Sequence, residues 1–269
     1  MGSNRTRNEE MGMLEELTEM RRLDAIRDKA ARPLAVLERE IAGMGAAPDF
    51  RGAFAGRGGI IAEIKRASPS EGDIRPGLDA GAVAREYEAA GAAAISVLCE
   101  PHRFKGSRAD LAAARGVVEV PLLCKDFVAG RYPIAAARVA GASAVLLIAA
   151  VLGDRELREL REYAEEVGLE ALVETHTAEE VKRAVGSGAR VVGVNCRDLR
   201  TFSTDPGITA GLLGESPAGC TRIAESGIRG AADVARLRAA GADGFLVGTA
   251  LMRAERPGEK LKELLGGLG

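Results

Sequence analysis

The hydrophobic positions near the N-terminus recur at multiples of three and four residues. Between Met11 and Met44 they fall at Leu14, Leu17, Leu23, Ile26, Leu34, Leu37, Ile41 and Met44. This spacing places them on one face of a helix. Because Pro33 cannot sit in a helix interior without breaking it, we expect two consecutive helices. The first residues, 1–10, are polar and charged, and we expect them to be disordered.

After residue 48, short apolar runs alternate with amphipathic helical segments. Eight runs have the length and composition of buried strands, at residues 59–65, 93–98, 121–125, 144–148, 171–174, 191–195, 222–225 and 244–248. Their starts lie 20 to 34 residues apart, which leaves room for the helix that a parallel crossover requires. Segments 154–167 and 231–240 have the expected helical periodicity. The pattern predicts eight βα units.

Three of the helical segments end alike, with an Ala-Gly-Ala sequence before the next apolar run. Their glycines are Gly91, Gly141 and Gly241, and glycine just past a helix tolerates the left-handed conformation. Eight units without a linker predict an α/β fold, a single (β/α)8 TIM barrel over residues 46–269, preceded by an N-terminal helical extension over residues 1–45. An open doubly wound sheet is the alternative, but no nucleotide-binding glycine motif follows a strand.

Composition and charge narrow the class of protein. The chain is 46% hydrophobic, which excludes a disordered protein. Its 37 basic and 39 acidic residues give a net charge of −2, so we expect neither nucleic acid nor a membrane as a partner. The longest uncharged apolar stretch, 139–153, is shorter than the roughly 20 residues of a membrane-spanning helix.

The cysteines and histidines give no sign of a bound metal. Cys99, Cys124, Cys196 and Cys220 are far apart and lack CxxC spacing, so we expect reduced residues in a cytoplasmic protein. With only two histidines in the chain, we expect no metal site and no cofactor. We expect a monomer, with a weak homo-oligomer as the alternative.

Charged and amide side chains follow the ends of several predicted strands. In a barrel, alternate strand residues point inward and the active site lies at the C-terminal ends of the strands. In the first run, Glu63 and Lys65 share the inward face with Ile61. A charged pair inside a barrel is costly unless it is used or paired, and a buried structural ion pair is the alternative interpretation.

Other strand ends add to this set. Lys125 ends the third run on the same face as Phe127 and would place a cation at the barrel mouth, although a surface lysine is the alternative. Glu174 ends the fifth run, and Asn195 and Arg197 end the sixth. Convergence of so many polar groups on one end of the barrel favours a catalytic site over core packing.

The last two strands lead into glycines beside hydroxyl groups. Ser226 and Gly227 follow the seventh run, and Gly248 and Thr249 follow the eighth. Glycines let backbone amides approach an oxyanion, and phosphate sites after strands seven and eight recur in this fold. Each pair alone would be an ordinary turn, but together they predict a phosphate site.

These motifs resemble those of the indole-3-glycerol phosphate synthase family. The segments that carry the resemblance follow the family's order and spacing: 61–70, 96–100, 123–127, 172–174, 193–199, 224–228 and 247–251. The resemblance covers essentially the whole chain, including the helical extension that the family carries before its barrel. It implies that the small-molecule phosphorylated substrate is 1-(2-carboxyphenylamino)-1-deoxyribulose 5-phosphate, whose pyrrole ring is closed with loss of CO2 and water in tryptophan biosynthesis.

The resemblance also implies roles for individual residues. Lys125 would be the general acid, Lys65 would hold the phosphate or carboxylate side, and Glu174 would stabilise a cationic intermediate and transfer protons. Three residues would position these groups: Glu63, Asn195 and Arg197. Five would line the phosphate end: Ser68, Ser226, Gly227, Gly248 and Thr249. Phe127 would pack against the anthranilate ring.

Three positions depart from the family pattern. Thr249 stands where Ser is frequent and keeps the hydroxyl, and Cys99 replaces a frequent Thr. Glu71 stands in the first loop where many bacterial members have Lys. A family role for a loop cation at that position therefore does not carry over to this chain.

Three other functions remain open from the residues. A phosphoribosyl isomerase would share the barrel and the phosphate site but would not need the Glu63, Lys65 and Lys125 set. A Schiff-base lyase would use Lys125 as its nucleophile. A non-catalytic binder of phosphorylated ligands would have kept the fold without turnover, which the intact acid–base residues argue against.

Overall fold

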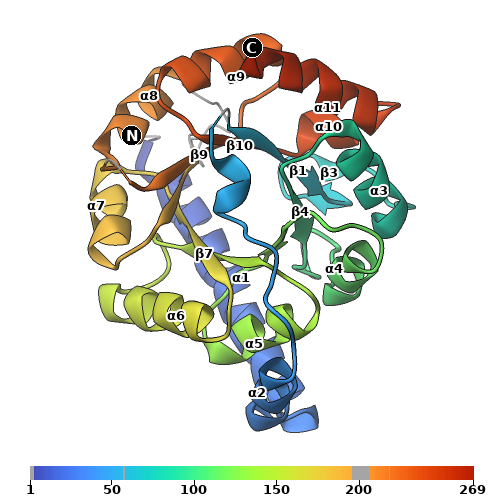
Figure 1. Ribbon diagram of the computed structural model, residues 1–269. Helices are drawn as coiled ribbons and strands as arrows, with labels where there is room; N and C mark the ends of the chain where they lie inside the picture. The colour runs from blue at the N-terminus through green and yellow to red at the C-terminus, as the bar shows by residue number, and fades with distance from the viewer. Residues whose placement is uncertain (1–2, 57, 196–205, 218) are drawn as a thin grey trace.

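The protein forms a closed barrel of eight parallel strands with helices around it (Figure 1). The computed structural model describes residues 3–56, 58–195, 206–217 and 219–269. The barrel strands are β1 (Gly59–Ile64), β4 (Ala94–Leu98), β5 (Leu122–Lys125), β6 (Ala144–Ile148), β7 (Glu170–Thr175), β8 (Val191–Asn195), β9 (Thr221–Glu225) and β10 (Gly244–Val247). Each lies within one residue of its predicted bounds, and β1 closes the barrel against β10. The predicted TIM barrel is confirmed.

Helices follow each of the barrel strands along the chain, as the periodicity predicts. They are α3 (Ala80–Ala90), α4 (Arg108–Arg115), α5 (Arg131–Val139), α6 (Asp154–Glu166), α7 (Ala178–Gly186), α8 (Pro206–Glu215), α9 (Ala231–Ala239), α10 (Thr249–Met252) and α11 (Pro257–Leu265). Gly91, Gly141 and Gly241 have φ values of 97°, 93° and 99°. These left-handed conformations let each chain turn from a helix into the next strand.

Alternation along the strands separates two apolar cores. Ile60, Ala62 and Ile64 belong to the core between the strands and the outer helices. Ile61 belongs to the core inside the barrel, where it shares the inward face predicted for Glu63. The period-two pattern therefore assigns the faces correctly.

Two phenylalanines close the end of the barrel where the strands begin. The rings of Phe50 and Phe54 meet edge to face at 5.4 Å. Phe54 lies in a short 3-10 turn, η1 (Gly52–Phe54), and a second such turn, η2 (Gly266–Leu268), ends the chain. A Cβ at Gly244 would lie 2.8 Å from the Phe54 ring. Glycine is thus required at position 244 for the two phenylalanine rings to close this end of the barrel. The open end is the one where the strands terminate.

The N-terminal extension consists of α1 (Ser3–Ala31) and α2 (Leu34–Ala42). Pro33 lies at the boundary between the two helices, as predicted. The first helix begins at Ser3, before the expected start at Met11. No helix in the described part of the chain is long and apolar enough to cross a membrane.

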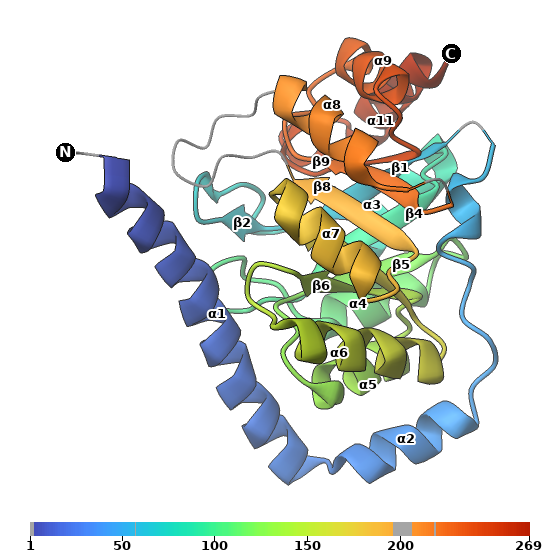
Figure 2. The ribbon, with the colours of Figure 1, turned by 90° about the vertical axis from the view of Figure 1, so that its left-hand side faces the viewer.

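The extension runs beside the mouth of the barrel. In Figure 2, α1 is a long oblique rod whose N-terminal half lies on the same side as the β2 hairpin. That antiparallel hairpin, β2 (Ala67–Ser68) with β3 (Gly72–Asp73), follows β1 and was not predicted. Leu17 of α1 is buried in the same core as the barrel interior. Arg21 donates to both carboxylate oxygens of Asp126, at 2.8 and 2.6 Å, and so ties α1 to the end of β5.

Candidate active site

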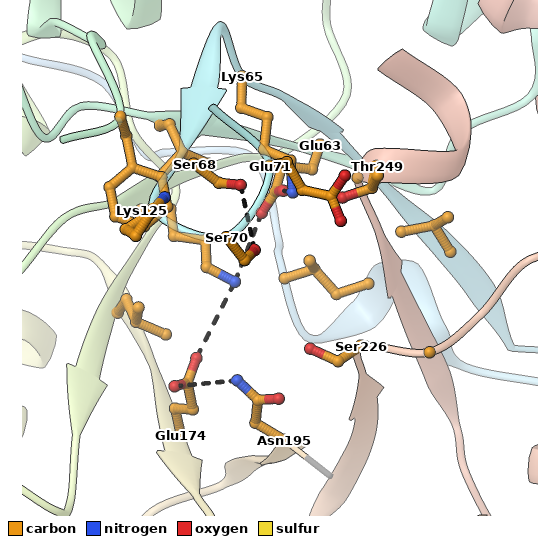
Figure 3. A pocket seen from close by; sticks show the side chains of 18 of the residues that line it. Glu63, Lys65, Ser68, Ser70, Glu71, Lys125, Glu174, Asn195, Ser226 and Thr249 are labelled. Carbon is orange, nitrogen blue, oxygen red and sulfur yellow. Dashed lines mark hydrogen bonds and ion pairs between the residues drawn. The ribbon is translucent and has the colours of Figure 1, made fainter. Parts of the chain in front are cut away.

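A cavity of about 570 Å³ opens at the C-terminal ends of the strands. It is lined by residues that end or follow each of the eight barrel strands, together with apolar side chains of α1. Of the predicted site residues, eleven line it: Glu63, Lys65, Ser68, Lys125, Phe127, Glu174, Asn195, Ser226, Gly227, Gly248 and Thr249. Figure 3 shows how Lys125, Glu174 and Asn195 point toward one another across this space. The predicted residue Arg197 lies outside the described residues.

Lys125 is the centre of a buried cluster of charges. Its Nζ lies 3.4 Å from Glu63 Oε2, 3.2 Å from Glu225 Oε2 and 3.9 Å from Glu174 Oε2. Lys65 Nζ lies 2.8 Å from Glu63 Oε1. Glu63 therefore joins both lysines, and the inward charged pair predicted on β1 is part of a larger network.

Two glycines make room for this network. A Cβ at Gly248 would lie 2.0 Å from Glu63 Oε1 and 2.9 Å from Lys65 Nζ. A Cβ at Gly193 would lie 2.1 Å from Glu225 Oε1. All three distances are inside van der Waals contact, so glycine at each position is required for this arrangement of the carboxylates.

The charges of the cluster keep both Lys125 and Glu63 ionised. Burial alone would raise the pKa of Glu63, but the ammonium groups of Lys65 and Lys125 outweigh burial and lower it to about 2. Burial alone would lower the pKa of Lys125, but the carboxylates of Glu225, Glu63 and Glu174 outweigh burial and raise it well above its usual range. Lys125 is therefore an ammonium group at neutral pH.

Glu225 is a charged residue of the site that the sequence interpretation missed. Its side chain is only 1% exposed. Burial is the largest cause of its raised pKa, the negative charge of Glu174 adds to it, and Lys125 opposes it, with a net value of about 8. A signal was present in the sequence, because Glu225 ends the seventh predicted run as Glu174 ends the fifth. The structure adds that Glu225 pairs in register with Asn195.

Glu174 is held by neighbours on both sides. Asn195 Nδ2 donates to Glu174 Oε1 at 3.3 Å, and His176 Nε2 lies 3.4 Å from the same oxygen. Burial alone would raise the pKa of Glu174, but Lys125 and His176 outweigh burial and lower it. Two carboxyl groups of one cluster, Glu174 and Glu225, thus have pKa values shifted in opposite directions. This is the arrangement expected where one group accepts and another supplies a proton.

An apolar slot lies beside Lys125. The rings of Phe127 and Phe104 are 6.3 Å apart, and Leu146, Ile148 and Leu14 line the same part of the cavity. Phe104 was not predicted, because it lies in a polar loop. The buried carboxylate of Glu100 shapes that loop by accepting hydrogen bonds from the backbone N–H groups of residues 102, 103 and 104. This apolar lining has the chemistry to pack against an aromatic ring.

The turns predicted for a phosphate lie across the cavity from two residues of the charged cluster: Figure 3 shows Ser226 and Thr249 on the side away from Lys125 and Glu174. Ser226 and Gly227 have φ values of 65° and 72°, a sharp left-handed turn directly after β9. Arg253, which follows α10, also lines the cavity, and its guanidinium is paired with the carboxylate of Glu71 in the loop after β1.

Within the described ranges, no group of three or more His, Cys, Asp or Glu side chains could hold a metal ion. The lining residues present ammonium, carboxylate, amide and hydroxyl groups to a ligand. Such a set can bind an anion, donate a proton and accept one. The fold and the site together define a (β/α)8-barrel enzyme with acid–base chemistry at the mouth of its barrel.

Comparisons with known proteins give the family. A model of indole-3-glycerol phosphate synthase matches residues 14–264. The synthase of Leifsonia xyli is 46% identical over 258 residues, covering 94% of this chain and 98% of that one. The synthase of a Nocardioides species is 43% identical over 257 residues, covering 95% and 99%. The chain belongs to the indole-3-glycerol phosphate synthase family, as its sequence motifs predict.

Solved structures of other families share the barrel. Thiamine phosphate pyrophosphorylase from Pyrococcus furiosus superposes with a TM-score of 0.60 at 17% identity, covering 79% of this chain and 96% of that one. A mandelate oxidase mutant with benzaldehyde superposes with a TM-score of 0.58 at 17% identity, covering 78% and 70%. At such low identity these likenesses show the fold alone.

Proposed function

We propose that this chain is a carboxy-lyase of tryptophan biosynthesis that forms indole-3-glycerol phosphate. Its substrate would be 1-(2-carboxyphenylamino)-1-deoxyribulose 5-phosphate, whose ring it closes with loss of CO2 and water. The observation that carries the proposal is Lys125 among three carboxylates, with an aromatic slot on one side and phosphate-type loops on the other.

Lys125 is the general acid of the proposed reaction. Its side chain is an ammonium group at neutral pH and would donate a hydrogen bond to the ketose carbonyl oxygen. That oxygen gains negative charge as the aromatic carbon attacks the carbonyl carbon. Transfer of a proton to that oxygen completes the new carbon–carbon bond, and a placed acid of this kind accelerates a step by roughly 10²–10⁴-fold. Loss of CO2 then restores the aromatic ring.

The carboxylates and Lys65 act around this step. Glu174 is ionised, so it would stabilise the positive charge on the anilino nitrogen and accept a proton when water leaves. Lys65 would bind the carboxylate or phosphate side of the substrate, oriented by its 2.8 Å contact with Glu63. Asn195 would keep Glu174 in position, and Arg197 is proposed as a further positioning residue.

Substrate binding divides between the two ends of the cavity. Ser68, Ser226, Gly227, Gly248 and Thr249 would hold the phosphate through hydroxyl and backbone N–H groups. Phe127, with Phe104, would hold the anthranilate ring in the apolar slot. Separate sites for the anion and the ring would fix the reacting carbons near each other, which lowers the entropy cost of ring closure.

The protonation state of Lys125 argues against a Schiff-base lyase. A lysine must lose its proton before its nitrogen can attack a carbonyl group. Three carboxylates around Lys125 oppose that loss. We further propose that the protein is cytoplasmic, since the described cysteines Cys99, Cys124 and Cys220 are free thiols. A monomer, with a weak homo-oligomer as the alternative, remains our expectation for its oligomeric state.

The test follows indole fluorescence on addition of the substrate, for the unaltered chain and for Lys125→Ala. The chain contains no Trp, so the product is seen against a clean background. We expect the signal from the unaltered chain and a rate lower by about 10²–10⁴-fold for Lys125→Ala. Lys182→Ala, a change at an exposed lysine of α7, is the matched control and should keep full activity. Binding of the substrate without turnover by the unaltered chain would refute the proposal.

A further inference from the structure

A histidine outside the predicted site lies between two carboxylates. His176 Nε2 is 3.4 Å from Glu174 Oε1, and His176 Nδ1 is 3.4 Å from Glu180 Oε2. The side chain is only 12% exposed and lines the cavity. Its buried Nδ1 makes no well-aligned hydrogen bond, so the attraction to Glu180 depends on the charge of the ring.

The start of α7 holds Glu180 in place. Thr177 caps this helix, and its hydroxyl accepts a hydrogen bond from the Glu180 N–H at 3.1 Å. The Glu180 carboxylate turns back and accepts a hydrogen bond from the backbone N–H of His176 at 2.8 Å. This is a form of the capping box predicted by a Thr-x-x-Glu sequence. The carboxylate is therefore a fixed group, with its position set by the helix rather than by solvent.

The surroundings keep the imidazole charged. Burial alone would lower the pKa of His176, but the carboxylates of Glu180, Glu174 and Glu225 outweigh burial and raise it. Glu174 in turn faces Lys125 of β5 at 3.9 Å, Asn195 of β8 at 3.3 Å, the Glu225 carboxyl of β9 and His176 just beyond its own strand. Lys125 lies nearest the oxygen Oε2, whereas Asn195 and His176 both contact Oε1.

We propose that His176, held by Glu180, is a positioning residue that fixes the orientation of the Glu174 carboxylate and keeps it ionised for catalysis. The ring would hold Oε1 away from Lys125 and leave Oε2 directed at the reacting groups. Glu180 acts through His176 and touches no substrate. The inference rests on the proposed function for its kinetic consequences, but the charge on His176 is a property of the free protein.

The first test measures that charge directly. The chain has two histidines, so the ¹⁵N-labelled imidazole spectrum contains two spin systems, and His176→Asn assigns them. We expect the His176 ring to remain doubly protonated above the ordinary histidine pKa of about 6.5. Glu180→Gln should lower its titration midpoint by about one unit, whereas Glu179→Gln, an exposed carboxylate on the same turn, should not. Equal titration midpoints of His176 in the unaltered chain, Glu180→Gln and Glu179→Gln would overturn the proposal.

The second test uses the ring-closure assay. His176→Asn keeps a hydrogen-bond donor but removes the charge, so we expect kcat to fall about tenfold with KM little changed. The acidic limb of kcat/KM should move about one unit to higher pH, because Glu174 loses a neighbouring positive charge. Glu180→Gln should cause part of both changes and Glu179→Gln neither.

These readouts separate the two proposals. Inactivity of the unaltered chain would refute the proposed function, while the imidazole titration would still decide the charge of His176. An active chain whose kcat and acidic limb are unaltered in His176→Asn and Glu180→Gln would overturn the positioning role. A loss of thermal stability alone, with an unaltered pH profile, would show that His176 and Glu180 form a structural ion pair and would likewise refute the positioning role.

Discussion

Gly193→Ala should disturb the charged cluster around Lys125 through a single methyl group. The glycine lies in β8 and faces the barrel interior. An added Cβ would lie 2.1 Å from Glu225 Oε1 and 3.3 Å from a Leu172 methyl carbon. Glu225 is 1% exposed and has no solvent to move into. The new methyl group must therefore displace the carboxylate within a packed interior.

The structure sets the size of the effect. The carboxylate must retreat by about 1 Å to restore van der Waals contact, and overpacking of this kind costs about 1–3 kcal/mol. Above pH 8, where Glu225 is ionised, a retreat that lengthens its 3.2 Å contact with Lys125 to about 4.2 Å would also weaken their attraction by roughly 1 kcal/mol at an effective dielectric constant of about 20. We expect the free energy of unfolding to fall by about 1–3 kcal/mol at neutral pH, and by up to about 4 kcal/mol above pH 8.

Two assays report the result. Urea unfolding followed by far-ultraviolet circular dichroism gives the change in unfolding free energy, and the ring-closure assay gives kcat. Gly186→Ala makes the same chemical change at an exposed position of α7 with no atom within 4 Å of the new Cβ. Alanine is a better helix former than glycine, so that control should be stabilised by up to about 1 kcal/mol.

Gly193→Ala should lower the free energy of unfolding and Gly186→Ala should raise it, so the pair of variants can refute the prediction. If Gly193→Ala is as stable and as active as the unaltered chain, Glu225 can move at no cost. The packing of the cluster would then be loose, and Gly193 would have no role in placing the carboxylate. A loss of stability with unaltered kcat would show instead that the position of Glu225 is irrelevant to the rate.

Two further changes test other contacts of the site. Arg21→Met should destabilise the protein by about 3–5 kcal/mol, because it leaves the buried Asp126 without its ion-pair partner. Arg22→Met, at a half-exposed residue, is the control and should cost less than about 1 kcal/mol. Equal losses of unfolding free energy in urea would contradict a stabilising role for the ion pair between Arg21 and Asp126. Glu225 has a pKa raised from 4.5 to about 8, so the native state binds its proton more tightly and loses stability as pH rises from 4.5 to 8. Glu225→Gln should therefore be more stable than the unaltered chain at pH 8, with a gap that narrows toward pH 5; a gap independent of pH would refute the shift.

The strands, the caps and the inward face could be predicted because each depends on local rules. Side chains alternate along a strand whatever its partners are, so the placement of Glu63 on the inward face followed from the local run of apolar and charged residues. Gly91, Gly141 and Gly241 were predictable for a similar reason, since a left-handed residue after a helix favours glycine.

Which strand ends face one another is decided by closure of the barrel. Lys125 and Glu225 are 100 residues apart in the chain, and no local pattern states that their side chains meet. The register between β8 and β9 sets Glu225 beside Asn195, and burial then raises its pKa. A strand-end glutamate could be recognised as polar and inward from the sequence, but its protonation behaviour required the neighbours.

The side chains that α1 and the loop after β4 contribute to the site could be placed only from the tertiary structure. Leu17 reads from the sequence as one apolar position of a helix, yet it is buried with the barrel interior because Arg21 reaches Asp126 across 105 residues. Phe104 lies in a polar loop and reaches the slot because Glu100 folds that loop. The sequence by itself determined the elements, their faces and the family chemistry. The packing of distant segments decided which groups meet, how deeply they are buried and therefore which of them hold a proton.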